Sequence, residues 1–213
     1  MGDFTIENFW KPRFSALQQQ QLSLLKGWSI PATALNTFKE APLTLSNGFG
    51  SGDDAATSPV ILVSAPGAVG KSTLARQVAS GTGATYVDLA VADPVGANTL
   101  SGGLVKAGLF DAWKQGAAAV LLDGLDEARL RVTQEAFEAF LQEVADASQG
   151  RGIPTVLFGR TGAVQDAWLV LADRVPVAVL EIGYYGKEDA LYLPTPLRRG
   201  LIADSRWHGP ERS

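Results

Sequence analysis

The residues of this chain best able to do chemistry are found first in the run Ala65-Pro66-Gly67-Ala68-Val69-Gly70-Lys71-Ser72. Glycines at such spacing let a backbone curl, so that its amides and a following helix N-terminus form an anion cradle. Lys71 adds a positive charge toward β- and γ-phosphates, and Ser72 offers a hydroxyl to Mg²⁺. The run matches the relaxed phosphate-loop pattern, with Ala65 in place of the first glycine. It predicts that nucleotide is bound by Pro66, Gly67, Ala68, Val69, Gly70, Lys71, Ser72 and Thr73.

A second group is acidic and directly follows an apolar run, at Asp123, Asp126 and Glu127. Asp123 leaves the run where a carboxylate can hold a Mg²⁺ shell, which is the Walker B role, so Ser72 and Asp123 are the candidate metal ligands. Asp126 and Glu127 follow within reach of the γ-phosphate side, where a carboxylate can orient an attacking water. The sequence leaves open how these two share that work. A solvated acidic turn is the alternative, because Asp-Gly and Asp-Glu are common in loops.

The third candidate is Arg160, which follows the apolar run 155–158 and one glycine. A guanidinium at the end of a strand beside the phosphate loop can contact the γ-phosphate, tell ATP from ADP and stabilise a transition state. A surface salt bridge and a strand cap are the alternatives. The candidate catalytic residues are therefore Glu127, Asp126 and Arg160. Arg129 and Arg131 could act on a neighbour's nucleotide, although a solvated helix start explains them better.

Composition narrows the remaining chemistry. The chain of 213 residues has no cysteine and one histidine, His208, which excludes thiolate catalysis and argues against a histidine zinc site or a Ser-His triad. The net charge is −4 without a basic block, so nucleic acid finds no electrostatic footprint. The N-terminus lacks a signal-peptide pattern, and no apolar stretch approaches the ~20 residues that span a bilayer. We expect a cytoplasmic protein without a membrane partner.

Strands and helices must alternate to position these groups. Short apolar runs predict strands at 60–63, 84–89, 118–122, 155–158 and 175–182. Helical spacing predicts helices at 71–80, 133–147 and 164–172, with one or two short helices within 98–116. This alternation predicts a parallel sheet covered by helices on both faces, with ligands at the carboxyl ends of the strands. Three of those ends carry the phosphate loop, the acidic group and Arg160.

The two ends of the chain have different patterns from this core. Residues 1–58 are expected to form a short helical extension and a linker, whereas 59–190 form the core and 191–213 a tail. The extension's apolar stripe comprises Phe14, Leu17, Leu24, Leu25 and Trp28. Glycine, serine and aspartate in 46–58 indicate an exposed linker.

An apolar strand running into Asp-Gly-Leu-Asp-Glu at 123–127, after a phosphate loop, resembles the STAND class of P-loop ATPases and its NACHT-like group. The resemblance covers roughly residues 59–190. It implies a three-layer P-loop NTPase fold with a five-stranded parallel sheet in the order 5-1-4-3-2, which would bring Arg160 beside the nucleotide. It also implies a signalling or defence switch that binds ATP with Mg²⁺, hydrolyses it slowly and often self-associates. The family's helical lid is not found, so the chain is expected to be truncated or to take a lid from a partner protein.

Two other functions remain open. A small-molecule kinase would use the same loop, but it usually brings an arginine-bearing lid and has no carboxylate placed to activate water. A scaffold that holds nucleotide without hydrolysis fits the missing lid, because catalysis needs a completed, water-excluding site. The sequence does not distinguish adenine from guanine nucleotides; ATP is the default, because the chain has no Asn-Lys-x-Asp motif of the GTPase kind.

Overall fold

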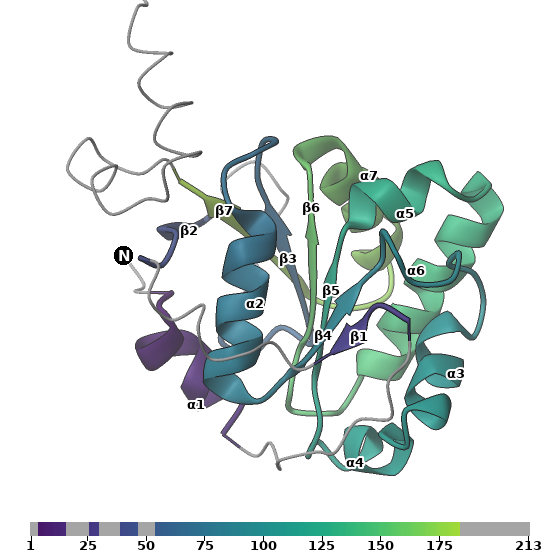
Figure 1. The fold of residues 1–213 in the computed structure, drawn as a ribbon, viewed down its shortest axis with the longest axis horizontal. Helices are drawn as coiled ribbons and strands as arrows, with labels where there is room; N and C mark the ends of the chain where they lie inside the picture. The colour runs from purple at the N-terminus through teal and green to yellow at the C-terminus, as the bar shows by residue number, and fades with distance from the viewer. Residues whose placement is uncertain (1–3, 16–25, 30–38, 47–53, 184–213) are drawn as a thin grey trace, which may run out of the picture.

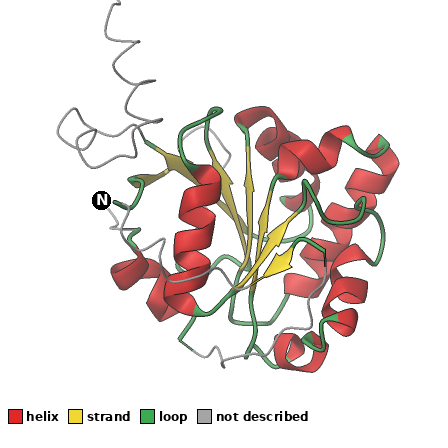
Figure 2. Cartoon of the chain, viewed as in Figure 1, coloured by secondary structure: helices red, strands yellow, loops and turns green. Residues whose placement is uncertain are grey.

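The computed structural model describes residues 4–15, 26–29, 39–46 and 54–183. They form one seven-stranded sheet between two layers of helices (Figures 1 and 2). The strand order is β1-β4-β5-β6-β3-β7-β2. The strands are β1 (Trp28–Ser29), β2 (Leu43–Leu45), β3 (Val60–Ser64), β4 (Thr85–Asp88), β5 (Val120–Asp123), β6 (Thr155–Gly159) and β7 (Val177–Ile182).

The prediction of a five-stranded, wholly parallel sheet is wrong, because β1 and β2 extend the sheet as antiparallel edge strands. The five strands between them are all parallel and lie in the order β7-β3-β6-β5-β4. In chain order these are the fifth, first, fourth, third and second of the parallel strands. Both edge strands are two or three residues long, too short to leave an apolar period that sequence reading can detect.

Among the described residues before β2, helical structure is found at 6–13. A π-helical turn, η1 (Ile6–Trp10), runs into α1 (Lys11–Arg13), and Thr5 caps the turn by accepting a hydrogen bond from the Asn8 amide. The spacing of Trp28 predicted that it lies in a helix. It lies instead in β1, where it pairs with Val87 of β4. Leu17, Leu24 and Leu25 of the predicted stripe lie outside the described residues.

One face of the sheet is covered by α2 (Lys71–Thr82) together with η1. Strand residues that alternate along β3, β5 and β6, such as Ile61, Leu121 and Phe158, pack there against Leu74 and Val78 of α2. Helix α2 ends at Gly83, whose positive φ of 82° forms a left-handed cap. This layer matters for function because α2 begins at the end of the phosphate loop.

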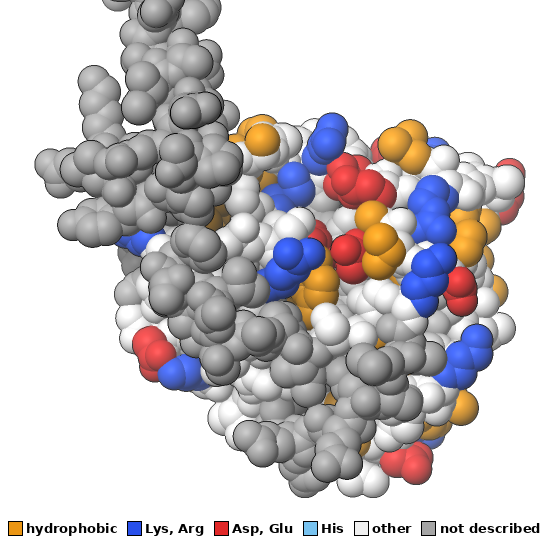
Figure 3. Space-filling model, in the orientation of Figure 1, with side chains coloured by type: hydrophobic (Ala, Val, Ile, Leu, Met, Phe, Trp, Pro, Cys, Tyr) orange, Lys and Arg blue, Asp and Glu red, His pale blue; other side chains and the backbone are white. Residues whose placement is uncertain are grey.

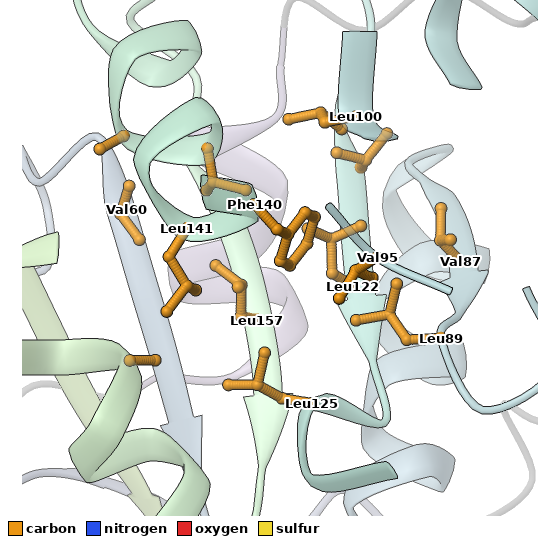
Figure 4. Packing of buried hydrophobic residues seen from close by; sticks show 14 of the residues in the cluster. Val60, Val87, Leu89, Val95, Leu100, Leu122, Leu125, Phe140, Leu141 and Leu157 are labelled. Carbon is orange, nitrogen blue, oxygen red and sulfur yellow. The ribbon is translucent and has the colours of Figure 1, made fainter. Parts of the chain in front are cut away.

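The other face carries the remaining helices. They are α3 (Thr99–Lys106), α4 (Phe110–Lys114), α5 (Leu125–Leu130), α6 (Gln134–Ser148) and α7 (Thr161–Leu171). Figure 4 shows Phe140 and Leu141 of α6 packed over Leu122 and Leu157 of the central strands. Of the one or two short helices expected around Gly108, the structure has two, α3 and α4. Short α5, in contrast, was not among the predicted helices.

The register brings three strand ends to one level. Ser64 at the end of β3 pairs with Gly159 at the end of β6, and Asp123 at the end of β5 pairs with Phe158. The segments that follow these ends therefore meet at one edge of the sheet. Among the described residues, no helix is both long and apolar enough to cross a membrane. The tail predicted at 191–213 lies outside the described residues.

Candidate functional site

The loop between β3 and α2 curls back on itself at the edge of the sheet. Positive φ angles alternate along it, 62° at Ala68 and 94° at Gly70, and such alternation turns backbone amides toward a common side. Ala68 is unusual in this respect, because residues with a Cβ rarely adopt positive φ. The loop is tied to the neighbouring strand where the Ala65 amide donates to the Gly159 carbonyl, at 3.3 Å.

The side chains of this loop and of the first turn of α2 provide charge and hydroxyl groups. Lys71 folds back over the loop, and its Nζ donates to the Pro66 carbonyl at 3.1 Å. Its ammonium therefore lies over the loop rather than pointing away from it. Ser72 is exposed and Thr73 partly buried. Gly70 at the N-cap position has no side chain to hydrogen-bond the first amides of the helix.

Asp123 closes β5 and is turned toward α2. Residues two apart on a strand share a face, and Leu121 packs in the cluster that contains α2, so Asp123 lies on the α2 side. Its side chain is almost fully buried, with 3% exposed. The hydroxyl of Tyr86 donates to Oδ2 of Asp123 at 2.7 Å. The carboxylate is thus held on the side of the sheet where Ser72 begins its helix.

Asp126 and Glu127 are carried by the first turn of α5. Gly124 starts this helix with a φ of 84°, a left-handed conformation that turns the chain sharply out of β5. A Cβ at Gly124 would lie 3.4 Å from Oε2 of Glu127 and 3.2 Å from the Ala90 amide nitrogen. Glu127 therefore points back toward the strand end rather than into solvent.

Arg160 is fixed by Asp126 and lies beside the phosphate loop. Oδ1 of Asp126 accepts the Arg160 backbone amide at 3.1 Å, and Oδ2 accepts its Nε at 2.8 Å. The guanidinium carbon lies 3.9 Å from where a Cβ on Gly67 would be. Arg160 nevertheless keeps 62% of its side chain exposed, while Asp126 keeps 16%. The arginine is thus aimed at the loop and still open to a ligand.

Close packing sets the distance between these segments. A Cβ at Gly159 would meet Leu125 Cβ at 3.0 Å, so glycine at this position lets α5 approach the end of β6. Ser64 and Thr161 join their hydroxyls at 3.3 Å and tie the end of β3 to the start of α7. Acidic and basic side chains lie side by side over the region between α2 and α5, toward the top of Figure 3.

Three other polar residues have structural contacts. Asp88 accepts the Ala90 amide at 3.0 Å and so caps a turn after β4. Arg131 donates to the carbonyls of Leu89 and Ala90 at 2.8 and 2.9 Å. Arg129 hydrogen-bonds Gln134 and lies over the ring of Phe137, 5.5 Å from its centroid. These contacts hold the loop after β4 and the start of α6 against α5.

Tyr86 is the site residue that the sequence analysis missed. Burial, first, and then the charge and hydrogen bond of Asp123 raise the pKa of its hydroxyl, which therefore remains a proton donor. Arg76 of α2 covers the ring, with its guanidinium carbon 5.1 Å from the centroid. Once the register is known, strand alternation identifies this residue: Asp88 pairs with Asp123, and Tyr86 lies two positions earlier on the same face.

The residues present fit Mg²⁺ better than a metal with a full set of protein ligands. Within the described residues, no three histidine, aspartate or glutamate side chains are grouped as metal ligands would be. Mg²⁺ is typically held by one or two carboxylates together with phosphates and several waters. Asp123 and the Ser72 hydroxyl, on the same side of the sheet, meet that modest requirement.

Comparisons with known proteins leave the family open. No family model and no curated protein matches the sequence. The fold is similar to solved structures of RuvB from Thermotoga maritima, one of them described as a Holliday junction branch migration motor, with 18% identity and a TM-score of 0.33. A point variant of that protein gives 18% identity and a TM-score of 0.38. In both comparisons the match covers 68% of this chain and 44% of the other, so the chain spans less than half of each protein.

Proposed function

We propose that this chain binds ATP with Mg²⁺ on the loop between β3 and α2 and hydrolyses it slowly, as a nucleotide-dependent switch. The observation that carries the proposal is the meeting of three groups at one sheet edge. A curled loop with a lysine follows β3, a buried carboxylate closes β5, and Arg160 follows β6 within 3.9 Å of a Cβ position on Gly67. Amides, a cation, a carboxylate and a guanidinium are together the groups that bind a triphosphate and its metal.

Each group has a separate role in this proposal. The loop amides and Lys71 hold the β- and γ-phosphates, while Ser72 and Asp123 hold Mg²⁺, which neutralises phosphate charge when bound. Arg160 contacts the γ-phosphate and so distinguishes ATP from ADP. Glu127 orients the attacking water. Asp126 positions Arg160, because both of its oxygens are already engaged by that residue.

Calorimetric titration with ATP and with ADP, each with Mg²⁺, tests the proposal after co-purified nucleotide has been removed. We expect Mg²⁺-dependent binding that favours ATP. Lys71→Ala should abolish binding of both nucleotides, because it removes the charge above the loop. Lys114→Ala is the matched control, since this lysine lies over the ring of Phe110, at 5.4 Å, and should bind as the parent does. A parent protein that binds neither nucleotide overturns the proposal.

A nucleotide-binding scaffold without hydrolysis is the second candidate. It is favoured by the exposed position of the arginine, since 62% of the Arg160 side chain faces solvent and catalysis requires water to be excluded. Glu127→Gln separates the two functions. Under the switch proposal this variant binds ATP as the parent does but no longer releases phosphate. Equal and negligible phosphate release from parent and variant would favour the scaffold.

A signalling or defence role is the finer part of the proposal. It rests on the resemblance of residues 123–127 to the acidic motif of NACHT-like ATPases. Such a switch would be expected to self-associate or to accept a lid from a partner protein when ATP is bound. Light scattering of the protein with ATP and with ADP tests this expectation, because only the ATP form should increase in mass.

A further inference from the structure

Tyr86 anchors the carboxylate that closes β5. We infer that Tyr86 is a positioning residue for Mg²⁺: its hydroxyl holds one oxygen of Asp123 so that the other is presented toward Ser72. The inference rests on the proposed function and adds to it a residue on a strand that carries none of the nucleotide-binding loops. It depends on three observations: the hydrogen bond between Tyr86 and Asp123, the register of β4 against β5, and the position of Arg76 over the Tyr86 ring.

The contact leaves the carboxylate with one restrained oxygen. The Tyr86 hydroxyl donates to Oδ2 of Asp123 at 2.7 Å, and both side chains are 3% exposed. A buried carboxylate without such a donor could rotate about its side-chain bonds and would lose a charge-assisted hydrogen bond. The Tyr86 hydroxyl can donate one hydrogen bond, and Asp123 accepts it. The tyrosine thus selects one orientation of Asp123.

The strand register makes this orientation productive. Asp88 pairs with Asp123 in the parallel ladder, and Tyr86 lies two residues before it on the face that α2 covers. The phenol therefore approaches the carboxylate from the neighbouring strand, within the sheet layer. Ser72 lies at the start of the helix above. A metal held between Ser72 and Asp123 would leave the tyrosine contact undisturbed.

Arg76 keeps the phenol in this place. It projects from α2, one helical turn after Ser72, and its guanidinium carbon lies 5.1 Å from the centre of the Tyr86 ring. A cation over an aromatic face is attracted by the ring electrons and excludes water from it. Helix α2 thus carries Ser72, the proposed metal ligand, and also Arg76, which covers Tyr86.

The test measures how ATP binding depends on Mg²⁺ in Tyr86→Phe, which keeps the ring and loses the hydroxyl. We expect the Mg²⁺ concentration for half-maximal ATP binding to rise about tenfold, the effect of one hydrogen bond to a charged group. Binding of ATP without Mg²⁺ should be unchanged. A merely structural role would shift both curves together. In the background of Asp123→Asn, adding Tyr86→Phe should have little further effect on Mg²⁺ dependence.

Ser148→Ala is the matched control. It removes another buried hydroxyl, which hydrogen-bonds Thr155 at 2.7 Å at the opposite end of the sheet. This variant should lose stability without a change in Mg²⁺ dependence. If the parent binds ATP with Mg²⁺ and Tyr86→Phe behaves like Ser148→Ala, the positioning role is overturned while the proposed function stands. A parent that binds no nucleotide overturns both.

Discussion

Strand β6 is flanked by two arginines that differ in almost every physical respect. Arg151 precedes its amino end, where Nε donates to the Trp113 carbonyl at 2.8 Å and Nη2 to the Ala118 carbonyl at 2.7 Å. Its guanidinium carbon lies 3.6 Å from the centre of the Trp113 ring. Arg160 follows the carboxyl end, is 62% exposed and is held by one carboxylate.

The difference separates a structural cation from one available to a ligand. Burial lowers the pKa of Arg151 to about 9, so the group is still protonated at neutral pH and its contacts are made by a charge. Those contacts are to fixed backbone carbonyls, which leaves little for a ligand to gain. Arg160 is paired with Asp126, and its guanidinium carbon lies beside Gly67 of the loop. Arg151 is thus held firmly by the fold and has little left to offer a ligand, whereas Arg160 is held less firmly and is open to one.

The largest expected effect is the loss of stability when Arg151, the structural arginine, is replaced. Arg151→Ala should lower the free energy of unfolding by about 3 kcal/mol, because two carbonyls lose a charged donor and Trp113 loses its stacking partner. Urea unfolding measures this change. Arg174→Ala is the control: its ion pair with Asp146, at 3.2 Å, is exposed, so about 0.5 kcal/mol is expected. Equal effects of the two variants would remove the distinction between a buried and an exposed arginine.

The opposite pattern is expected at the other end of β6. Arg160→Ala should weaken ATP binding by about 10- to 100-fold, the range for loss of one hydrogen-bonded charge contact. ADP binding should change little, because ADP has no γ-phosphate. Stability should fall by no more than about 1 kcal/mol, since the Asp126 pair is largely exposed on the arginine side. Calorimetry with both nucleotides checks the first two points and urea unfolding the third. A variant that loses ATP and ADP equally would assign Arg160 to the fold.

How much of this contrast the sequence predicts depends on the range of the interactions. The phosphate loop, Asp123 and Arg160 are recognisable because each follows an apolar run directly, so local pattern is enough. The contact between Asp126 and Arg160 spans 34 residues and the Tyr86 contact with Asp123 spans 37, and only the sheet register brings them together. Sequence spacing carries no direct signal for such pairs.

The edge strands show the same limitation in the fold. Trp28 has the spacing of a helical stripe, but its side chain packs where Gly103 of α3 leaves room, with a Cβ position 2.3 Å from the indole. Tertiary packing therefore overrides a local period at this position. Short α5 was missed for a related reason, because six residues are too few to show helical periodicity.

A smaller effect is expected when Asp126, the partner of the exposed Arg160, is changed. Asp126→Asn keeps an acceptor for the Arg160 amide but loses the charge that holds Nε. We expect the preference for ATP over ADP to fall by about threefold to tenfold, less than in Arg160→Ala, since the guanidinium remains present. Competition binding with the two nucleotides measures this preference. In the background of Arg160→Ala, adding Asp126→Asn should cause no further loss, because the two residues act as one unit. Independent losses would instead give Asp126 a role of its own in nucleotide binding.

The smallest expected effect concerns a carboxylate that, unlike Asp126, serves only its own helix. Glu135 lies in the first turn of α6, where a hydrogen bond from its own backbone amide and one from Thr133 lower its pKa from the ordinary value of 4.5. Because the folded state binds this proton less readily, the stabilisation is present above pH 4.5 and is lost as the pH falls through the lowered value. Glu135→Gln should therefore unfold at slightly lower urea than the parent at about pH 7, with the gap closing as the pH falls below 4.5 and through the lowered pKa of Glu135. Nucleotide binding should not change at any pH, which distinguishes a local cap from the Asp126–Arg160 pair. A gap that stays constant with pH would mean that the charge of Glu135 contributes nothing to the cap.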